Sequence, residues 1–177
     1  MQSRFILTGA PGAGKTALIR QLESLGHEIV EEAATDVIAL AQAKGTERPW
    51  EHPEFITEIA RLQEFREAAP MRSRQRFADR SLFCTLALAE WLGRPVPHEL
   101  LARAAQLVAD GWFQRRVFFV EQLGFIENTE ARRISFADAV EFGTVHETVY
   151  LRYGFELVPV PPASIPERTK AILAACS

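Results

Sequence analysis

The sequence predicts a single α/β domain in which a parallel sheet is covered by helices on both faces. Short apolar runs of strand length alternate with longer segments of helical periodicity along the chain, a pattern typical of strand–helix–strand units. The 177 residues, 47% of them hydrophobic and 24% charged, are enough for one hydrophobic core, and no repeat or linker divides them. We therefore expect one domain over residues 1–177.

Five apolar runs have the length of buried strands, and we expect strands at residues 4–8, 27–30, 75–78, 117–120 and 155–160. Helical spacing of apolar residues predicts helices at residues 14–25, 34–43, 54–69, 82–92, 98–109, 136–153 and 164–175. Gly26, Pro70 and Gly154 mark helix ends. Residues 46–53 are expected to form a loop, and residues 121–135 have no clear period.

The segment between the first strand and the first helix carries the strongest signal in the chain. Residues 9–16 match the P-loop pattern G-x-x-x-x-G-K-[ST]. Glycines let the backbone wrap closely around a phosphate, so that successive N–H groups and the helix N-terminus face the anion. The residues expected to bind the nucleotide are Thr8, Gly9, Ala10, Pro11, Gly12, Ala13, Gly14, Lys15 and Thr16.

Two of these residues have a defined chemical role in a P-loop. Lys15 supplies a positive charge to the β- and γ-phosphates, and the Thr16 hydroxyl is a ligand for Mg²⁺. The sequence therefore predicts a site for a nucleoside triphosphate with Mg²⁺. It leaves ATP and GTP as alternatives, because base contacts depend on loop details.

Acidic residues follow the second and third predicted strands. Glu31 and Glu32 follow the second strand, and Asp79 follows the third, with Arg80 beside it. The carboxyl ends of parallel strands meet at one edge of a sheet, where the P-loop is also expected. Asp79 is placed to hold Mg²⁺, Arg80 to meet a phosphate, and one glutamate to orient or deprotonate an acceptor hydroxyl.

Two arginines lie in the irregular stretch before the long helix at residues 136–153. Arg132 and Arg133 are placed to fold over a triphosphate and stabilise the transferring phosphoryl group, with Arg132 preferred. We expect a lid at about residues 121–135. The expected catalytic set is Lys15, Glu32, Asp79, Arg80 and Arg132.

The motifs, in their order along the chain, resemble the AAA_28 family of predicted ATPases, which is similar to the nicotinamide riboside kinase domain of NadR proteins. The resemblance covers nearly the whole chain and rests on residues 5–16, 30–34, 77–81, 132–136 and 153–161. It implies a three-layer, nucleotide-kinase-like P-loop NTPase fold with a five-stranded parallel sheet of order 2-3-1-4-5. It also implies a mobile lid around Arg132 and a loop on the adenine side near residues 162–164.

Kinases of similar build carry a glutamate after strand two and an acid–Arg–Ser triplet after strand three. Glu32 and residues 79–81 match these positions, and the match favours Glu32 over Glu31. Two departures lie near the expected acceptor. Thr35 stands where the family usually has arginine, and residues 121–125 lack a segment that is usually proline-rich with a tryptophan. The identity of the acceptor is therefore left open.

Two functions fit these observations. The first is an ATP-dependent kinase that phosphorylates a small, nucleoside-like hydroxyl acceptor with Mg²⁺. The second is a switch or binding module that hydrolyses ATP or GTP and acts on a protein or lipid partner. The absence of the Asn-Lys-x-Asp signature of GTPases weakens the second function.

Composition and residue spacing argue against several classes of protein. The net charge of −3 argues against nucleic-acid binding through bulk charge, and no apolar run reaches membrane-spanning length. Cys84, Cys176 and the four histidines show no metal-ligand spacing. The three tryptophans are expected in the core or at an interface. We expect a cytoplasmic protein that binds neither nucleic acid nor membrane, and a homodimer remains open.

Overall fold

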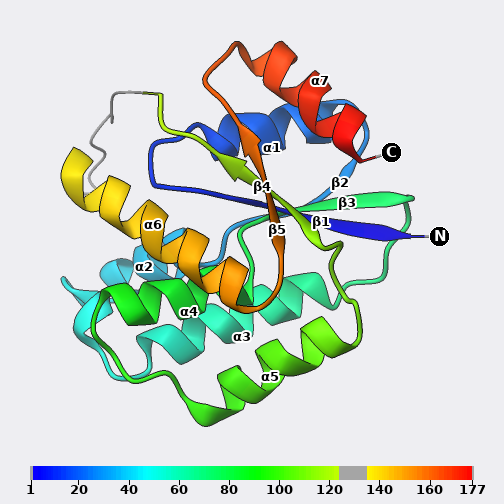
Figure 1. Cartoon of the computed structure of the whole chain (residues 1–177). Coiled ribbons are helices and arrows are strands. Elements are labelled where there is room, and N and C mark those ends of the chain that lie inside the picture. Colours follow the sequence, from blue (N-terminus) through cyan, green and yellow to red (C-terminus); the bar gives the residue numbers. More distant parts are fainter. Residues whose placement is uncertain (1, 124–134, 177) are drawn as a thin grey trace.

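The protein is built on a five-stranded sheet, which is seen in a computed structural model that describes residues 2–123 and 135–176 (Figure 1). The strands are β1 (Ser3–Thr8), β2 (Glu28–Val30), β3 (Gln75–Asp79), β4 (Arg116–Val120) and β5 (Glu156–Val160). All pair in parallel, in the order β2-β3-β1-β4-β5. The predicted sheet and its order are therefore confirmed.

The helices divide between the two faces of the sheet (Figure 1). One face packs against α1 (Lys15–Ser24) and α7 (Ile165–Ala175). The other packs against α2 (Ala34–Ala43), α3 (Phe55–Glu67), α4 (Leu82–Trp91), α5 (His98–Ala109) and α6 (Phe136–Arg152). Each predicted helix is present, and no end differs by more than two residues from the prediction.

Alternation of side chains along the strands supplies both cores. In β1, Phe5 and Leu7 face α1 and α7, whereas Ile6 faces the larger group of helices. Both sides of the strand are apolar because the sheet is covered on both faces. α4 is apolar almost all round, since it lies between α3 and α6 as well as against the sheet.

One element differs from the expected loop at residues 46–53. A short 3-10 helix, η1 (Pro49–Glu51), lies there, and its first residue is proline. Proline suits this position because its missing N–H would have no partner within the helix. None of the helices in residues 2–123 and 135–176 combines the length and the apolar character needed to cross a membrane.

A buried carboxyl group at the end of α3 makes stability depend on pH. Glu67 is 5% exposed, and Gln63 Nε2 donates a hydrogen bond to Glu67 Oε1 over 3.0 Å. Burial raises the pKa of Glu67 from 4.5 to about 7. Between these two pH values the folded chain holds a proton that the unfolded chain has released. The folded state is therefore destabilised as the pH rises from 4.5 through 7.

Replacing this carboxyl group tests the assignment. Glu67→Gln keeps the shape and a hydrogen-bond acceptor, and we expect it to stabilise the protein at pH 8 by up to about 3 kcal/mol. At pH 5 the gain should fall to about 1 kcal/mol or less, because pH 5 lies only slightly above the pKa of the carboxyl in the unfolded chain. Urea unfolding at both pH values measures the difference. An equal effect at pH 5 and pH 8 would show that Glu67 does not titrate as described.

Candidate functional site

The P-loop leaves the end of β1 with backbone angles that require glycine. Gly9 has φ +125°, and a Cβ at this position would lie 2.3 Å from the carbonyl oxygen of Val120 on β4. Gly14 has φ +84° and directly precedes the first residue of α1. The close approach to β4 and the turn into α1 thus fix the path of the loop.

Lys15 lies inside the loop that it belongs to. Its side chain is buried, and Nζ donates hydrogen bonds to Gly9 O over 3.0 Å and to Ala10 O over 2.7 Å. Thr16 follows in the first turn of α1 and is exposed. An ammonium group, a hydroxyl and a helix N-terminus therefore come together, as phosphate and Mg²⁺ binding by a P-loop requires.

Thr8, expected beside the nucleotide, turns its side chain away from the loop. Its hydroxyl lies 3.3 Å from Cys84 Sγ on α4, in a fully buried position. Cys84 Sγ and Ser81 Oγ each contact the hydroxyl of Tyr150 on α6, at 3.1 and 2.7 Å. A buried polar cluster therefore joins the end of β1 to α4 and α6.

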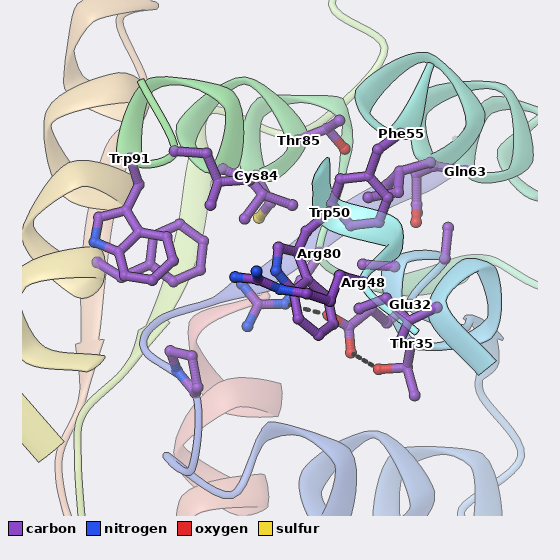
Figure 2. Close-up of a pocket in the computed structure, with 18 of the residues that line it drawn as sticks. Glu32, Thr35, Arg48, Trp50, Phe55, Gln63, Arg80, Cys84, Thr85 and Trp91 are labelled. Carbon is purple, nitrogen blue, oxygen red and sulfur yellow. Dashed lines mark hydrogen bonds and ion pairs between the residues drawn. The ribbon is translucent and has the colours of Figure 1, made fainter. Parts of the chain in front are cut away.

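The two glutamates after β2 point in different directions. Glu31 is half exposed and pairs with Arg20 of α1, with 2.5 Å between Oε1 and Nη2. Glu32 is largely buried, and its Oε1 lies 2.8 Å from Nε of Arg80. Thr35 donates a hydrogen bond to the other carboxylate oxygen of Glu32. The structure thus brings Glu32, and not Glu31, together with the residues after β3 (Figure 2).

Asp79 and Arg80 end β3 beside the P-loop strand. Asp79 is 4% exposed and is in register with Leu7 of β1. Arg80 N donates a hydrogen bond to Leu7 O over 3.0 Å. Among the described residues, Arg80 is the only non-glycine with positive φ, at +71°. An arginine in this conformation is held there by its surroundings, and such strain is often found at functional sites.

The Arg80 guanidinium is held from two sides. Glu32 lies on one side, and on the other Arg80 Nη1 donates a hydrogen bond to Nε2 of His146 over 2.8 Å. His146 Nδ1 donates in turn to Phe142 O over 2.8 Å, which fixes the imidazole tautomer. Burial, together with the charge of Arg80, holds the pKa of His146 well below its usual range. Neutral His146 is therefore an acceptor for Arg80.

Sequence reasoning missed His146, because no metal-ligand spacing surrounds it. One signal was available: His146 and Tyr150 are polar residues one turn apart in a predicted helix, and both are fully buried in the structure.

The expected contact of Arg132 lies outside the described residues, as does Arg133. In the part of the chain that is described, no three His, Cys, Asp or Glu side chains form a metal-binding group.

A cavity of about 1060 Å³ opens beside the P-loop. Glu32, Arg80 and Pro11 belong to its wall, which joins the cavity to the residues just described (Figure 2). Aromatic residues form much of the rest of the wall, namely Trp50, Phe55, Trp91 and Phe142. Trp91 stacks on Phe142 with ring centroids 4.9 Å apart. All three tryptophans pack against the hydrophobic core, as expected, and two of them, Trp50 and Trp91, also line the cavity.

The fold and the loop together define a nucleotide-kinase-like P-loop protein. The AAA_28 family model, described as an AAA domain, matches residues 4–168. The chain therefore belongs to the AAA_28 family, and the resemblance inferred from the sequence is confirmed. No curated protein matches the chain.

Solved structures show the same fold at low sequence identity. A NadR protein in complex with NR is 15% identical with a TM-score of 0.70, over 98% of this chain and 50% of that one. This chain thus spans about half the length of the NadR chain. A deoxyadenosine kinase from M. mycoides with bound dATP is 13% identical with a TM-score of 0.64, over 99% of both chains. Shikimate kinase from Acinetobacter baumannii in complex with shikimate is 15% identical with a TM-score of 0.61, over 99% of this chain and 93% of that one.

Two glycine substitutions test the path of the P-loop. Gly9→Ala places a methyl group against the Val120 carbonyl, so we expect a loss of more than about 4 kcal/mol in the free energy of unfolding. Gly45→Ala is the control, because Gly45 also has positive φ but nothing within 4 Å. It should lose only about 1 kcal/mol. Similar losses in the two variants, measured by urea unfolding, would contradict the described approach of the loop to β4.

Proposed function

We propose that this protein is a kinase that transfers the γ-phosphoryl group of ATP to a hydroxyl group of a small acceptor. The observation that carries the proposal is the cavity beside the P-loop, with Glu32 and Arg80 in its wall. Phosphoryl transfer needs a nucleotide and an acceptor in neighbouring sites from which water can be excluded. The P-loop supplies the first site and the cavity the second.

The cations next to the loop match the charge that develops during transfer. Lys15 is already inside the loop, where it would contact the β- and γ-phosphates. Arg80 lies in the cavity wall and would meet the phosphoryl group on the acceptor side. Burial alone would lower the pKa of Arg80, but Glu32, Asp79 and Cys84 together more than offset burial and raise this pKa above its usual value, so Arg80 stays charged. Arg132 is proposed as a further contact from a lid.

Glu32 is the proposed acceptor-side base. Its Oε1 forms an ion pair with Arg80, and a carboxylate can accept a hydrogen bond from an attacking hydroxyl. The hydrogen bond from Thr35 and the contact with Arg80 restrict its rotation, so one orientation toward the cavity is maintained. Glu32 would therefore orient the acceptor and receive its proton as the new bond forms.

Thr16 and Asp79 are the proposed Mg²⁺ ligands. Both supply oxygen, which Mg²⁺ prefers, and a site of one or two protein ligands completed by phosphates and water is usual for this ion. When bound, Mg²⁺ would neutralise the charge of the β- and γ-phosphates. The exposed Thr16 hydroxyl comes from the first turn of α1, and the buried Asp79 carboxylate comes from the end of β3.

The aromatic wall favours an acceptor with a planar or apolar part. Trp50, Phe55, Trp91 and Phe142 would stack against a base or ring, while a sugar-like hydroxyl group reaches Glu32. The structures with bound NR and dATP support a nucleoside-like acceptor and an ATP-type donor. The shikimate complex shows that this fold also accepts a ring that is not a nucleoside. A cytoplasmic site of action, without nucleic acid or membrane, belongs to the same proposal.

Three variants test the proposal. Thermal shifts with Mg²⁺ complexes of ATP and GTP identify the donor, and an ATP-consumption screen of nucleosides and other small hydroxyl compounds identifies the acceptor. Lys15→Ala should abolish nucleotide binding. Glu32→Gln should keep ATP binding but lower transfer about 100-fold or more, because the base is lost. Glu31→Gln is the matched control and should behave like wild type, since Glu31 pairs with Arg20 instead.

The outcomes separate the two candidate functions. Protein that binds no nucleotide would overturn the proposal at its first step. Protein that binds and slowly hydrolyses a nucleotide, prefers GTP and phosphorylates no compound in the screen would instead be a switch or binding module.

A further inference from the structure

Two polar side chains from distant parts of the chain hold carbonyl groups of the P-loop. Gln122, which follows β4, donates a hydrogen bond from Nε2 to Pro11 O over 3.0 Å. Arg168 of α7 donates one from Nη1 to Ala13 O over 3.1 Å. α7 lies beside α1, which the P-loop leads into (Figure 1). The loop is therefore held by groups outside its own sequence motif.

Holding a carbonyl also orients the amide on the same peptide plane. The peptide bond is planar and trans, so the C=O of one residue and the N–H of the next point in opposite directions. Fixing Pro11 O directs Gly12 N–H away from Gln122, and fixing Ala13 O directs Gly14 N–H away from Arg168. The amide N–H groups of a P-loop donate hydrogen bonds to phosphate oxygens.

Arg168 also places a charge beside the loop. It is 2% exposed, and a Cβ built on Gly14 would lie 3.3 Å from its Nη1. Its other guanidinium contacts are Glu121 O and Val160 O, at 3.2 and 3.3 Å. In residues 2–123 and 135–176 its hydrogen-bond partners are backbone carbonyls, and the Glu121 carboxylate attracts it without forming an ion pair. A buried cation with this surrounding is stabilised by a nearby anion.

We propose that Arg168 and Gln122 are positioning residues for triphosphate binding, which preset the Gly14 and Gly12 amides, and that Arg168 adds positive charge behind them. This inference rests on nucleotide binding in the proposed function, and it goes beyond it by assigning a role to α7 and to the segment after β4. Preset amides lose less entropy and need less rearrangement when a phosphate binds. Neither residue needs to touch the nucleotide for this effect.

The experiment compares Mg·ATP affinity in four folded variants by isothermal titration calorimetry. Arg168→Met and Gln122→Met remove the donors with little change in side-chain size, and we expect each to weaken binding about tenfold. Arg168→Lys keeps the positive charge but not the several fixed N–H donors of the guanidinium, so its loss of Mg·ATP affinity should be smaller than that of Arg168→Met. Arg116→Met is the matched control, because Arg116 also ties β4 to α7, through Ala175 O over 2.9 Å, but at the start of β4, whereas the loop approaches Val120 at its end. It should bind like wild type.

A second measurement separates positioning from general stabilisation. Amide NMR spectra with and without Mg·ADP report each glycine of the loop. The nucleotide-induced shift should shrink mainly for Gly14 in Arg168→Met and mainly for Gly12 in Gln122→Met, because each side chain orients a different peptide. A general loss of stability would affect both glycines in both variants and would not single out a different glycine in each.

Two different results would contradict the proposed function and the positioning role separately. Wild-type protein that binds no nucleotide contradicts the proposed function itself. Wild-type protein that binds Mg·ATP, with affinities of both methionine variants within about twofold of it and with unchanged glycine shifts, would overturn this inference alone. If Arg168→Met does not fold, Arg168→Lys and Gln122→Met still decide the question.

Discussion

Positive charge is buried at the carboxyl edge of the sheet, and the rest of the site is arranged around it. Lys15, Arg80 and Arg168 are each less than 9% exposed, and they come from α1, the end of β3 and α7. Burying a cation is unfavourable unless hydrogen bonds and anions compensate for it. Backbone carbonyls surround Lys15 and Arg168, while Glu32 pairs with Arg80. A bound triphosphate would complete this compensation.

The buried charge also accounts for features that would otherwise be unrelated. His146 is neutral because burial, together with the charge of Arg80, opposes its protonation, and as a neutral acceptor it can hold the guanidinium. Arg80 keeps an unfavourable backbone conformation because Leu7, Glu32 and His146 all hold it. Since Phe142 lies between His146 and Trp91, the same helix that holds Arg80 also forms part of the cavity wall.

The division of helices between the faces separates the two halves of the site. α1 and α7 contact the P-loop from one face, and α2, α3, α4 and α6 surround the cavity on the other. Among the described residues, Pro11 of the loop, Glu32 and Arg80 lie where the two halves meet, and α6 also approaches the loop at Ala10. A phosphoryl donor bound at the P-loop and an acceptor bound in the cavity would meet at these residues, where the buried positive charge is concentrated.

Local sequence could predict the fold and the strand-end residues, because both follow from short-range patterns. Periodicity located the five strands and seven α-helices of the described residues but not η1, and parallel pairing accounts for the position of Glu32, Asp79 and Arg80 at the strand ends. The contacts of Arg80 with His146 and of Arg168 with Ala13 join residues 66 and 155 positions apart. No local pattern encodes such pairs. The cavity could not be predicted from local sequence either, since its wall combines residues from Pro11 to Phe142.

The most direct test of the central claim is a crystal structure with Mg²⁺ and a non-hydrolysable ATP analogue. The triphosphate should lie in the loop between Gly9 and Thr16, with its γ-phosphate facing the cavity beside Arg80 and Glu32. A γ-phosphate separated from the cavity by protein atoms, or a nucleotide bound away from the loop, would contradict the claim that the P-loop and the cavity form one site.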